Sequence, residues 1–378
     1  MSTNEELLSH IIAGIEPADT PAMGAAQKRW NSLAKPVGGL GLLEELIVRI
    51  AGISRTPDVR LNKRELIVAC ADNGVVEHGV SASDASVTRI IAQALGEGES
   101  TACYMARQAG CSVTPVDVGM RRGPKLPNVV ERAVRPGGTA DISSGPAMTR
   151  EECVATILNG IELVRERSAA GIDVLLTGEM GIGNTTTTTA VTCALLKKDP
   201  RELVGPGAGL SQEDVARKAA IIESVLALNQ PNADDPLDVL CKVGGFDLAA
   251  ICGICLGGAR YRVPILLDGI ITLAAALCAV RLCPMARFAL LGSHVSEEPC
   301  ARLLLDELRI DAPIHAHMHL GEGTGALAAL PMLDVALAVY TNSRSLEQLN
   351  IDGYHPATQP ATQPTMQPAT RPATQPAM

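Results

Sequence analysis

The sequence predicts an α/β fold in which helices cover both faces of a mostly parallel sheet. From residue 66 onward, short apolar runs alternate with longer segments of helical periodicity, and each run ends in a polar or glycine-rich loop. This alternation is typical of parallel strands joined by helical crossovers. Hydrophobic residues make up 47% of the 378 residues, but one Trp, four Tyr and two Phe are the only aromatic ones among them. Small aliphatic side chains must therefore fill the core.

The first sixty residues are expected to be helical. Residues 4–15 place apolar side chains three and four positions apart, and a second helix is expected over residues 25–33, after the break at Pro21. Residues 35–45 then supply a glycine turn and the start of a third helix.

Six apolar runs are expected to form the strands. Ligands of such folds bind at the carboxyl ends of the strands, so the loops that follow the runs are the candidate functional segments. The expected strands lie at residues 66–71, 112–118, 173–177, 263–267, 288–291 and 314–320.

Charge and composition exclude several classes of partner. The 32 Lys and Arg against 41 Asp and Glu give a net charge of −9, so no global positive field attracts nucleic acid or an anionic membrane.

Residues 1–10 are acidic and polar, unlike a signal peptide. The longest apolar run, residues 269–280, is shorter than the roughly 20 residues needed to span a bilayer. We expect a soluble protein.

Eleven cysteines are scattered through apolar segments of a chain that is long enough to fold without cross-links. Reduced thiols in the cytoplasm are therefore expected. Cys252 and Cys255 form a C-x-x-C pair, but no second pair stands at zinc-ribbon spacing. We expect these two side chains to belong to the core.

The stretch 173–190 is the most informative one. A buried strand runs into the glycine-rich residues 178–183, and Asn184 and Thr185 then begin a helix. Glycines and a helix N-terminus suit a phosphate group, although a tight strand-to-helix turn would require glycine as well. The spacing is neither that of a Walker loop nor G-x-G-x-x-G.

A second glycine-rich loop, residues 321–325, places Glu322 between glycines after an expected strand. Desolvation there would raise the pKa of its carboxyl group toward the range of a general base. The alternative is a glutamate that points into solvent.

Weaker signals lie in three further loops. Residues 204–210 lead toward Lys218, a possible phosphate partner, while residues 72–74 and 293–296 end two expected strands. His315, His317 and His319 alternate and would share one face of a strand, as metal ligands or as a hydrogen-bonded, solvent-lined face. We predict no metal site.

The last 24 residues form nearly a four-residue repeat, with a proline at every fourth position from Pro356 to Pro376. The repeat has no apolar face that could offset its ordering entropy, so we expect residues 351–378 to be a disordered tail.

Taken together, these segments resemble the nicotinate-nucleotide:dimethylbenzimidazole phosphoribosyltransferase family, which makes the lower-ligand nucleotide of cobamides. The resemblance extends from about Lys35 to about Leu346 and consists of eight segments in the family's order. They are KPVGGLGLLE (35–44), CADNGVVEHGVSAS (70–83), VDVGM (116–120), GPAMTR (145–150), GEMGIGNTT (178–186), KVGGFDLAAICGICLGGA (242–259), PILLDG (264–269) and LGEGTGA (320–326).

The resemblance implies a Rossmann-like catalytic domain, here residues 61–350. It also implies a small helical domain built from both ends of the chain, here residues 1–60 with part of the C-terminal segment, and assembly as a dimer. The implied reaction is attack of an aromatic base on C1′ of nicotinate mononucleotide. Nicotinate leaves, and the product carries an α-glycosidic bond. No cofactor is implied.

The resemblance also implies roles for particular residues. Glu322 corresponds to the general base and Glu179 to a second carboxylate of the active site. The phosphate site corresponds to Gly181, Ser296, Gly321 and Lys218, and we add Ser83 and Asn184 to the residues expected to bind substrate.

Three alternatives remain beside this interpretation. Some relatives act as heterodimeric pairs that attach phenols, and this chain would then pair with a paralogue. A weakly active partner subunit is a second alternative, although such a subunit would not need both Glu179 and Glu322. The third is a hydrolase that splits nicotinate mononucleotide with water.

Overall fold

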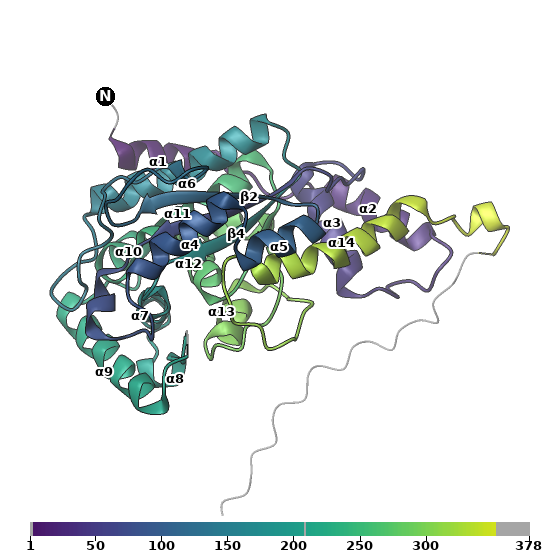
Figure 1. The fold of residues 1–378 in the computed structure, drawn as a ribbon. Helices are drawn as coiled ribbons and strands as arrows, with labels where there is room; N and C mark the ends of the chain where they lie inside the picture. The colour runs from purple at the N-terminus through teal and green to yellow at the C-terminus, as the bar shows by residue number, and fades with distance from the viewer. Residues whose placement is uncertain (1–2, 208, 353–378) are drawn as a thin grey trace, which may run out of the picture.

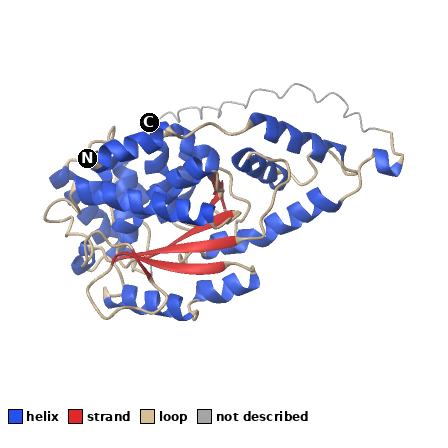
Figure 2. Ribbon diagram, turned by 90° about the horizontal axis from the view of Figure 1, so that it is seen from above, coloured by secondary structure: helices blue, strands red, loops and turns tan. Residues whose placement is uncertain are grey.

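The computed structural model describes residues 3–207 and 209–352. Its strands form one parallel sheet in the order β3-β2-β1-β4-β5-β6 (Figure 2). The chain moves outward from β1 in one direction through β2 and β3, and in the other through β4, β5 and β6. This is the doubly wound arrangement that the alternation of the sequence predicts. The strands are β1 (Arg64–Ala71), β2 (Ser112–Gly119), β3 (Val130–Glu131), β4 (Val174–Met180), β5 (Ile265–Leu267) and β6 (Leu290–Gly292).

Alternating side chains of the central strands serve two separate cores. In β1, Ile67 and Ala69 face one helical layer, whereas Leu66 and Val68 face the other, because successive side chains of a strand point to opposite faces. Figure 1 shows the two layers. The first contains α1 (Asn4–Ala13), α6 (Arg150–Ala169), α7 (Asn184–Leu196), α8 (Pro200–Leu203), α9 (Gln212–Asn229), α10 (Pro236–Val243), α11 (Phe246–Tyr261), α12 (Ile270–Leu282) and α13 (Ala301–Leu308). The second contains α2 (Thr20–Ser32), α3 (Leu42–Ser54), α4 (Ser86–Glu97), α5 (Thr101–Gln108) and α14 (Thr324–Asn342).

Two segments that are far apart in the sequence, around residues 30–34 and 340–344, meet beside the sheet. The amide of Ala34 donates to the carbonyl of Arg344 at 3.0 Å, and the ring of buried Trp30 lies 5.0 Å from that of Tyr340. Helices α2, α3 and α14 thereby form the extension on the right of Figure 1. Helix α1 packs elsewhere, against α6 and α11.

Helix α14 is long and apolar enough to cross a membrane, and half of its most apolar window is buried inside the fold. It packs against α3, α5 and β4. Both carboxylate oxygens of Asp334, on its outer side, accept from the guanidinium of Arg64, at 2.8 and 2.9 Å. These contacts identify α14 as a core helix of the α/β fold.

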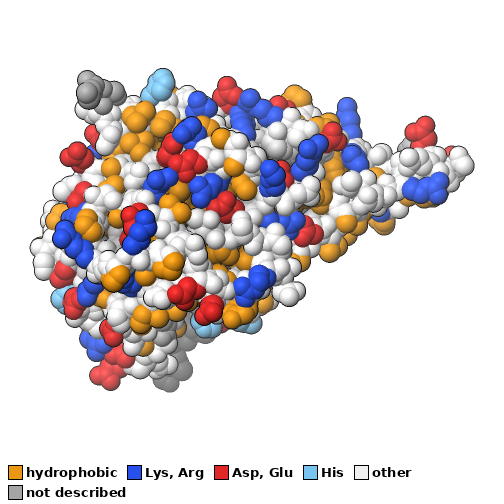
Figure 3. All heavy atoms as spheres, turned by 45° about the horizontal axis from the view of Figure 1, so that its top comes forward, with side chains coloured by type: hydrophobic (Ala, Val, Ile, Leu, Met, Phe, Trp, Pro, Cys, Tyr) orange, Lys and Arg blue, Asp and Glu red, His pale blue; other side chains and the backbone are white. Residues whose placement is uncertain are grey.

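The surface is mixed in charge. On the face drawn in Figure 3, Lys and Arg side chains alternate with Asp and Glu. Many of them pair, such as Arg150 with Asp235 and Arg165 with Glu162.

The strand expected over residues 314–320 is wrong. Only Ile314 bridges to the sheet, through His294, and His317 has a φ of +52° that breaks an extended conformation. The segment is mostly exposed, so no apolar face draws it into the sheet. The alternating histidines therefore do not share a strand face.

Other differences are local. Pro21 stands in the first turn of α2, which begins at Thr20 under the side-chain cap of Asp19, since proline is tolerated where no helical partner exists for its missing N–H. The short strand β3 was not expected from the sequence. The repeats of the expected tail, from residue 353 on, lie outside the described residues.

Candidate active site

A cavity of about 540 Å³ opens at the carboxyl ends of β4, β5 and β6. It brings together every residue predicted to act on substrate except Lys218. Those that line it are Ser83, Glu179, Gly181, Asn184, Ser296, Gly321 and Glu322.

Glu179 lies at the end of β4 and is 7% exposed. The side-chain amide of Asn184, in the first turn of α7, donates to Oε2 of Glu179. The same amide also donates to Oδ2 of Asp247, at 3.0 Å. Burial, and then the charge of Asp247, raise the pKa of Glu179 to about 8, against the lowering effect of the Asn184 hydrogen bond. The carboxyl group of Glu179 therefore binds a proton more readily than that of a solvated glutamate.

Glu322 occupies the loop before α14 with a φ of +56°, a conformation that a residue with a side chain adopts only where its surroundings hold it. Its Oε2 lies 3.4 Å from the amide nitrogen of Ala102, in the first turn of α5. Burial raises the pKa of Glu322, while the hydrogen bond from the Ala102 amide lowers it. Because burial is the larger of the two effects, the carboxylate of Glu322 accepts a proton near neutral pH more readily than a solvated carboxylate does.

Asp268 positions this loop. It follows β5, is 2% exposed, and accepts hydrogen bonds from the amides of Gly323 at 3.1 Å and Gly325 at 2.8 Å. A carboxylate at the first turn of a helix satisfies amides that have no helical partner. The sheet thereby fixes both the start of α14 and the place of Glu322.

The two predicted catalytic carboxylates face one space. Gly321 has a φ of +89°, and a side-chain Cβ at this position would lie 2.7 Å from Oε1 of Glu179. The loop that carries Glu322 therefore passes directly over Glu179, and only glycine leaves room for it.

Glycine and hydroxyl residues of the cavity suit an anion. Gly181 and Gly183 of the loop before α7 and Ser296 line the cavity, and a helix N-terminus favours negative charge. Lys218 on α9 lies behind the wall, 1% exposed, and its Nζ donates to the Thr185 hydroxyl at 2.8 Å. Burial lowers the pKa of Lys218 to about 8. Among the described residues, no Lys or Arg lines the cavity itself.

An apolar wall completes the cavity. Its side chains come from the segment before α4, from α4 itself and from the two glycine-rich loops. They are Val80, Val87, Ile91, Met180, Ile182 and Leu320. A flat aromatic ring would find a matching surface here.

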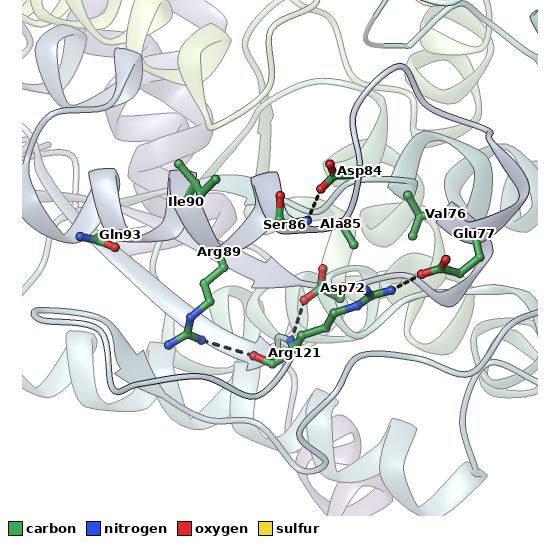
Figure 4. Close-up of a pocket in the computed structure, with 10 residues that line it drawn as sticks. All are labelled: Asp72, Val76, Glu77, Asp84, Ala85, Ser86, Arg89, Ile90, Gln93 and Arg121. Atoms are coloured by element: carbon green, nitrogen blue, oxygen red, sulfur yellow. Dashed lines mark hydrogen bonds and ion pairs between the residues drawn. The ribbon is translucent and has the colours of Figure 1, made fainter.

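A second cavity, of about 570 Å³, lies on the other side of α4 (Figure 4). Its charged groups bond to each other or to the backbone. Arg121 pairs with Glu77, and the amide of Arg121 donates to Asp72 at 2.6 Å. None of the predicted site residues lines it.

Metal binding finds no support in the described part of the chain, where no group of three or more His, Cys, Asp or Glu could hold an ion. Cys252 and Cys255 are fully buried within α11. The ring of His317 pairs with Glu297 at 2.6 Å in an exposed position.

Two further carboxylates were not predicted individually. Asp247 and Asp268 stand within matched segments of the sequence, yet neither is a lone acid in a glycine loop of the kind that drew attention to Glu322. The signal for Asp268 is its place directly after an apolar strand. For Asp247, at the start of an apolar helix, the sequence offers no comparable signal.

Paired carboxylates beside glycine-rich loops at the rim of a doubly wound sheet fit an α/β enzyme that transfers a phosphoribosyl group. In agreement, residues 15–351 match the family model described as Phosphoribosyltransferase.

Known relatives specify the family. A nicotinate-nucleotide–dimethylbenzimidazole phosphoribosyltransferase from Ruminiclostridium cellulolyticum is 41% identical over 345 residues, covering 91% of this chain and 98% of that protein. One from Escherichia coli O9:H4 is 40% identical over 352 residues, covering 93% and 97%. The crystal structure of CobT from Thermus thermophilus superposes with a TM-score of 0.82 at 37% identity, over 88% of this chain and 99% of that one. The chain belongs to the nicotinate-nucleotide–dimethylbenzimidazole phosphoribosyltransferase family.

The position of Asp268 leads to a test. In Asp268→Asn, one of the two loop amides loses its charged acceptor, a loss of about 1.5–3 kcal/mol. If this lost free energy displaces Glu322 from its catalytic position, kcat should drop roughly 10- to 100-fold. Asp117→Asn is the matched control, because Oδ1 of Asp117 accepts from the amides of Gly119 and Met120 at a turn outside the cavity. Steady-state kinetics on both folded variants would contradict this role if Asp268→Asn kept its kcat.

Proposed function

We propose that this enzyme transfers the 5-phosphoribosyl group of nicotinate mononucleotide to a dimethylbenzimidazole-like base, giving an α-ribazole phosphate and nicotinate. The observation that carries the proposal is the convergence of Glu179 and Glu322 on one cavity that also holds the amide-rich loop before α7. The transferase activity agrees with the family to which the chain belongs.

The chemistry requires little beyond alignment and one base. The pyridinium ring of the substrate leaves as nicotinate with a neutral ring, so the enzyme must place the lone-pair nitrogen of the acceptor in line with C1′. It must also remove the proton on the other ring nitrogen, which becomes acidic as the new N–C1′ bond forms. Glu322 is the base, because its partly desolvated carboxylate faces the cavity from a fixed loop. The negative charge of Glu322 also supports the oxocarbenium-like centre.

The phosphate is held away from the reacting carbon. Gly181, Gly321 and Ser296 present amide and hydroxyl donors at the cavity, and Lys218 supplies a positive charge through its contact with Thr185. Binding energy gained there orients the ribose for attack. Ser83 lines the cavity, and its proposed role is to contact the acceptor. Asn184 donates to Glu179 and holds that carboxyl group in place.

The acceptor base is proposed to lie against the apolar wall. A phenol would fit the same surface, so a heterodimeric pair that activates phenols is the alternative. Retention of both carboxylates in one cavity favours an active chain over a weakly active partner subunit. The apolar wall also favours transfer over hydrolysis, since it disfavours water.

We further propose a homodimer in the cytoplasm. All eleven cysteines are free and buried, as expected for a protein of a reducing compartment. Light scattering on the purified chain distinguishes the homodimer from a chain that needs a paralogue.

The decisive experiment is incubation of the purified chain alone with nicotinate mononucleotide and a panel of benzimidazoles, purines and phenols. We expect nicotinate release that depends on a benzimidazole, with a product of the mass of the α-ribazole phosphate. Release that needs only water would indicate a hydrolase, and product formation only with phenols, or only with an added paralogue, would favour the alternatives.

Replacing Glu322 tests the base. Glu322→Gln keeps the shape of the side chain but cannot accept the proton, so kcat should fall by about 10²- to 10⁴-fold. The affinity for nicotinate mononucleotide, measured by calorimetry, should change little. A near-normal turnover rate would refute the assignment.

Replacing Lys218 tests the phosphate anchor. Lys218→Ala removes a buried charge-assisted contact, so KM for nicotinate mononucleotide should rise about tenfold or more while kcat falls less. The exposed Lys198, at the end of α7, provides the control variant Lys198→Ala, which should leave both constants unchanged. A fall in kcat at constant KM would argue against an anchor.

A further inference from the structure

We infer that Asp247 is a positioning residue whose buried negative charge, held beside Glu179 by the Asn184 amide that the two side chains share, keeps Glu179 protonated and neutral in the active site. The inference rests on the proposed function for the role of Glu179 beside the substrate, but it concerns a residue to which that function assigns no part.

The geometry forces the two carboxyl groups to share one donor. Asn184 donates to Glu179 and to Asp247, and these two bonds use both hydrogens of its amide. Asp247 is 0% exposed and also accepts from the amide of Leu248 at 2.9 Å through Oδ1. Within the described part of the chain, Asn184 is the one donor to the carboxyl group of Glu179. Asp247 therefore accepts more hydrogen bonds than Glu179, and its negative charge is the better stabilised of the two.

The surroundings offer no cation that would keep both groups ionised. Of the titratable groups that face Glu179, Asp268 and Glu322 are acidic. Burial raises the pKa of Cys70 on the neighbouring strand β1 and lowers that of His294 beyond β6, so both are neutral near pH 7. Nζ of Lys218 donates to Thr185 and to the carbonyl of Gly205 instead. Two buried anions without a cation are costly, and one proton removes the cost.

The order of ionisation agrees with this arrangement. Burial raises the pKa of Asp247 to about 6, and that of Glu179 to about 8, with the charge of Asp247 as the second cause for Glu179. Because the two groups interact, these values describe the titration of the pair. Between them, the pair carries one proton, and the two donors to Asp247, against one to Glu179, place that proton on Glu179.

The proton has a defined place. Oε2 of Glu179 accepts from Asn184, whereas Oε1 faces Gly321 at the cavity. A protonated Oε1 would present a hydrogen-bond donor to the ligand and would reduce the negative charge of the wall by one unit. Both effects favour a substrate that carries a phosphate and a carboxylate, in a cavity without a lining Lys or Arg among the described residues.

Infrared spectroscopy of the full chain tests the inference without any turnover. A protonated carboxyl group shows a carboxylic-acid C=O band that is distinct from carboxylate bands. The difference spectrum between the unmodified protein and Glu179→Gln should contain this band at pH 7, and the band should vanish on titration with a midpoint near the value of about 8 given above. Asp247→Asn should lower that midpoint by about one pH unit or more, because one nearby negative charge is lost.

A second variant shifts the midpoint the other way. Asn184→Ala removes the bond that stabilises the Glu179 anion, so the midpoint should rise. Where Asp247→Asn does not fold, the carboxylic-acid band of the unmodified protein at pH 7 still tests whether Glu179 is protonated. Asp72→Asn, which removes a buried carboxyl group that bonds to the Arg121 amide instead, should leave the midpoint unchanged. Absence of the band at pH 7, or an unshifted midpoint in a folded Asp247→Asn or Asn184→Ala, would overturn the inference. Either result would leave the transferase assay untouched, so the proposed function would stand or fall separately.

Discussion

The hydrogen bonds from the Gly323 and Gly325 amides to Asp268 are the interaction on which the active site depends. They join the end of β5 to the start of α14, which packs against α3 and, through the rings of Tyr340 and Trp30, against α2. The catalytic loop is thereby held between the sheet and the helical extension. A base on a flexible loop would have to be ordered at each turnover. Here the loop is ordered when the chain folds, so the cost in conformational entropy does not add to the barrier of the reaction.

The same site shows how burial assigns different tasks to similar groups. Glu179 and Glu322 are chemically identical, but the first lies deep beside another carboxylate and the second lies at the first turn of a helix. Their environments push their proton affinities apart, as expected where one group must take up a proton and the other must keep one. The separation follows from position alone, because neither side chain pairs with Lys or Arg in the described part of the chain.

Much of this arrangement could be predicted from the sequence, and the exceptions have physical reasons. The strands around β1 and β4 and the two glycine-rich loops follow from apolar runs that end abruptly in small residues. The strand predicted over residues 314–320 was wrong because the histidines alternate as side chains of a strand do, although this segment has no apolar face to bury. Lys218 lies one layer behind its expected place, since Thr185 stands between it and the cavity. Asp247 contributes through its charge and its contact with Asn184, and a contact between two distant segments leaves no mark in local spacing.

The lack of lining Lys or Arg side chains among the described residues has a consequence for how the substrate arrives. A chain of net charge −9 repels an anionic nucleotide at long range, and its one compensating lysine acts only at contact distance from behind a hydroxyl. Dissolved salt screens the distant repulsion but hardly reaches the buried ammonium group. Moderate ionic strength should therefore speed the encounter, the reverse of the behaviour of enzymes that steer anions toward a basic mouth.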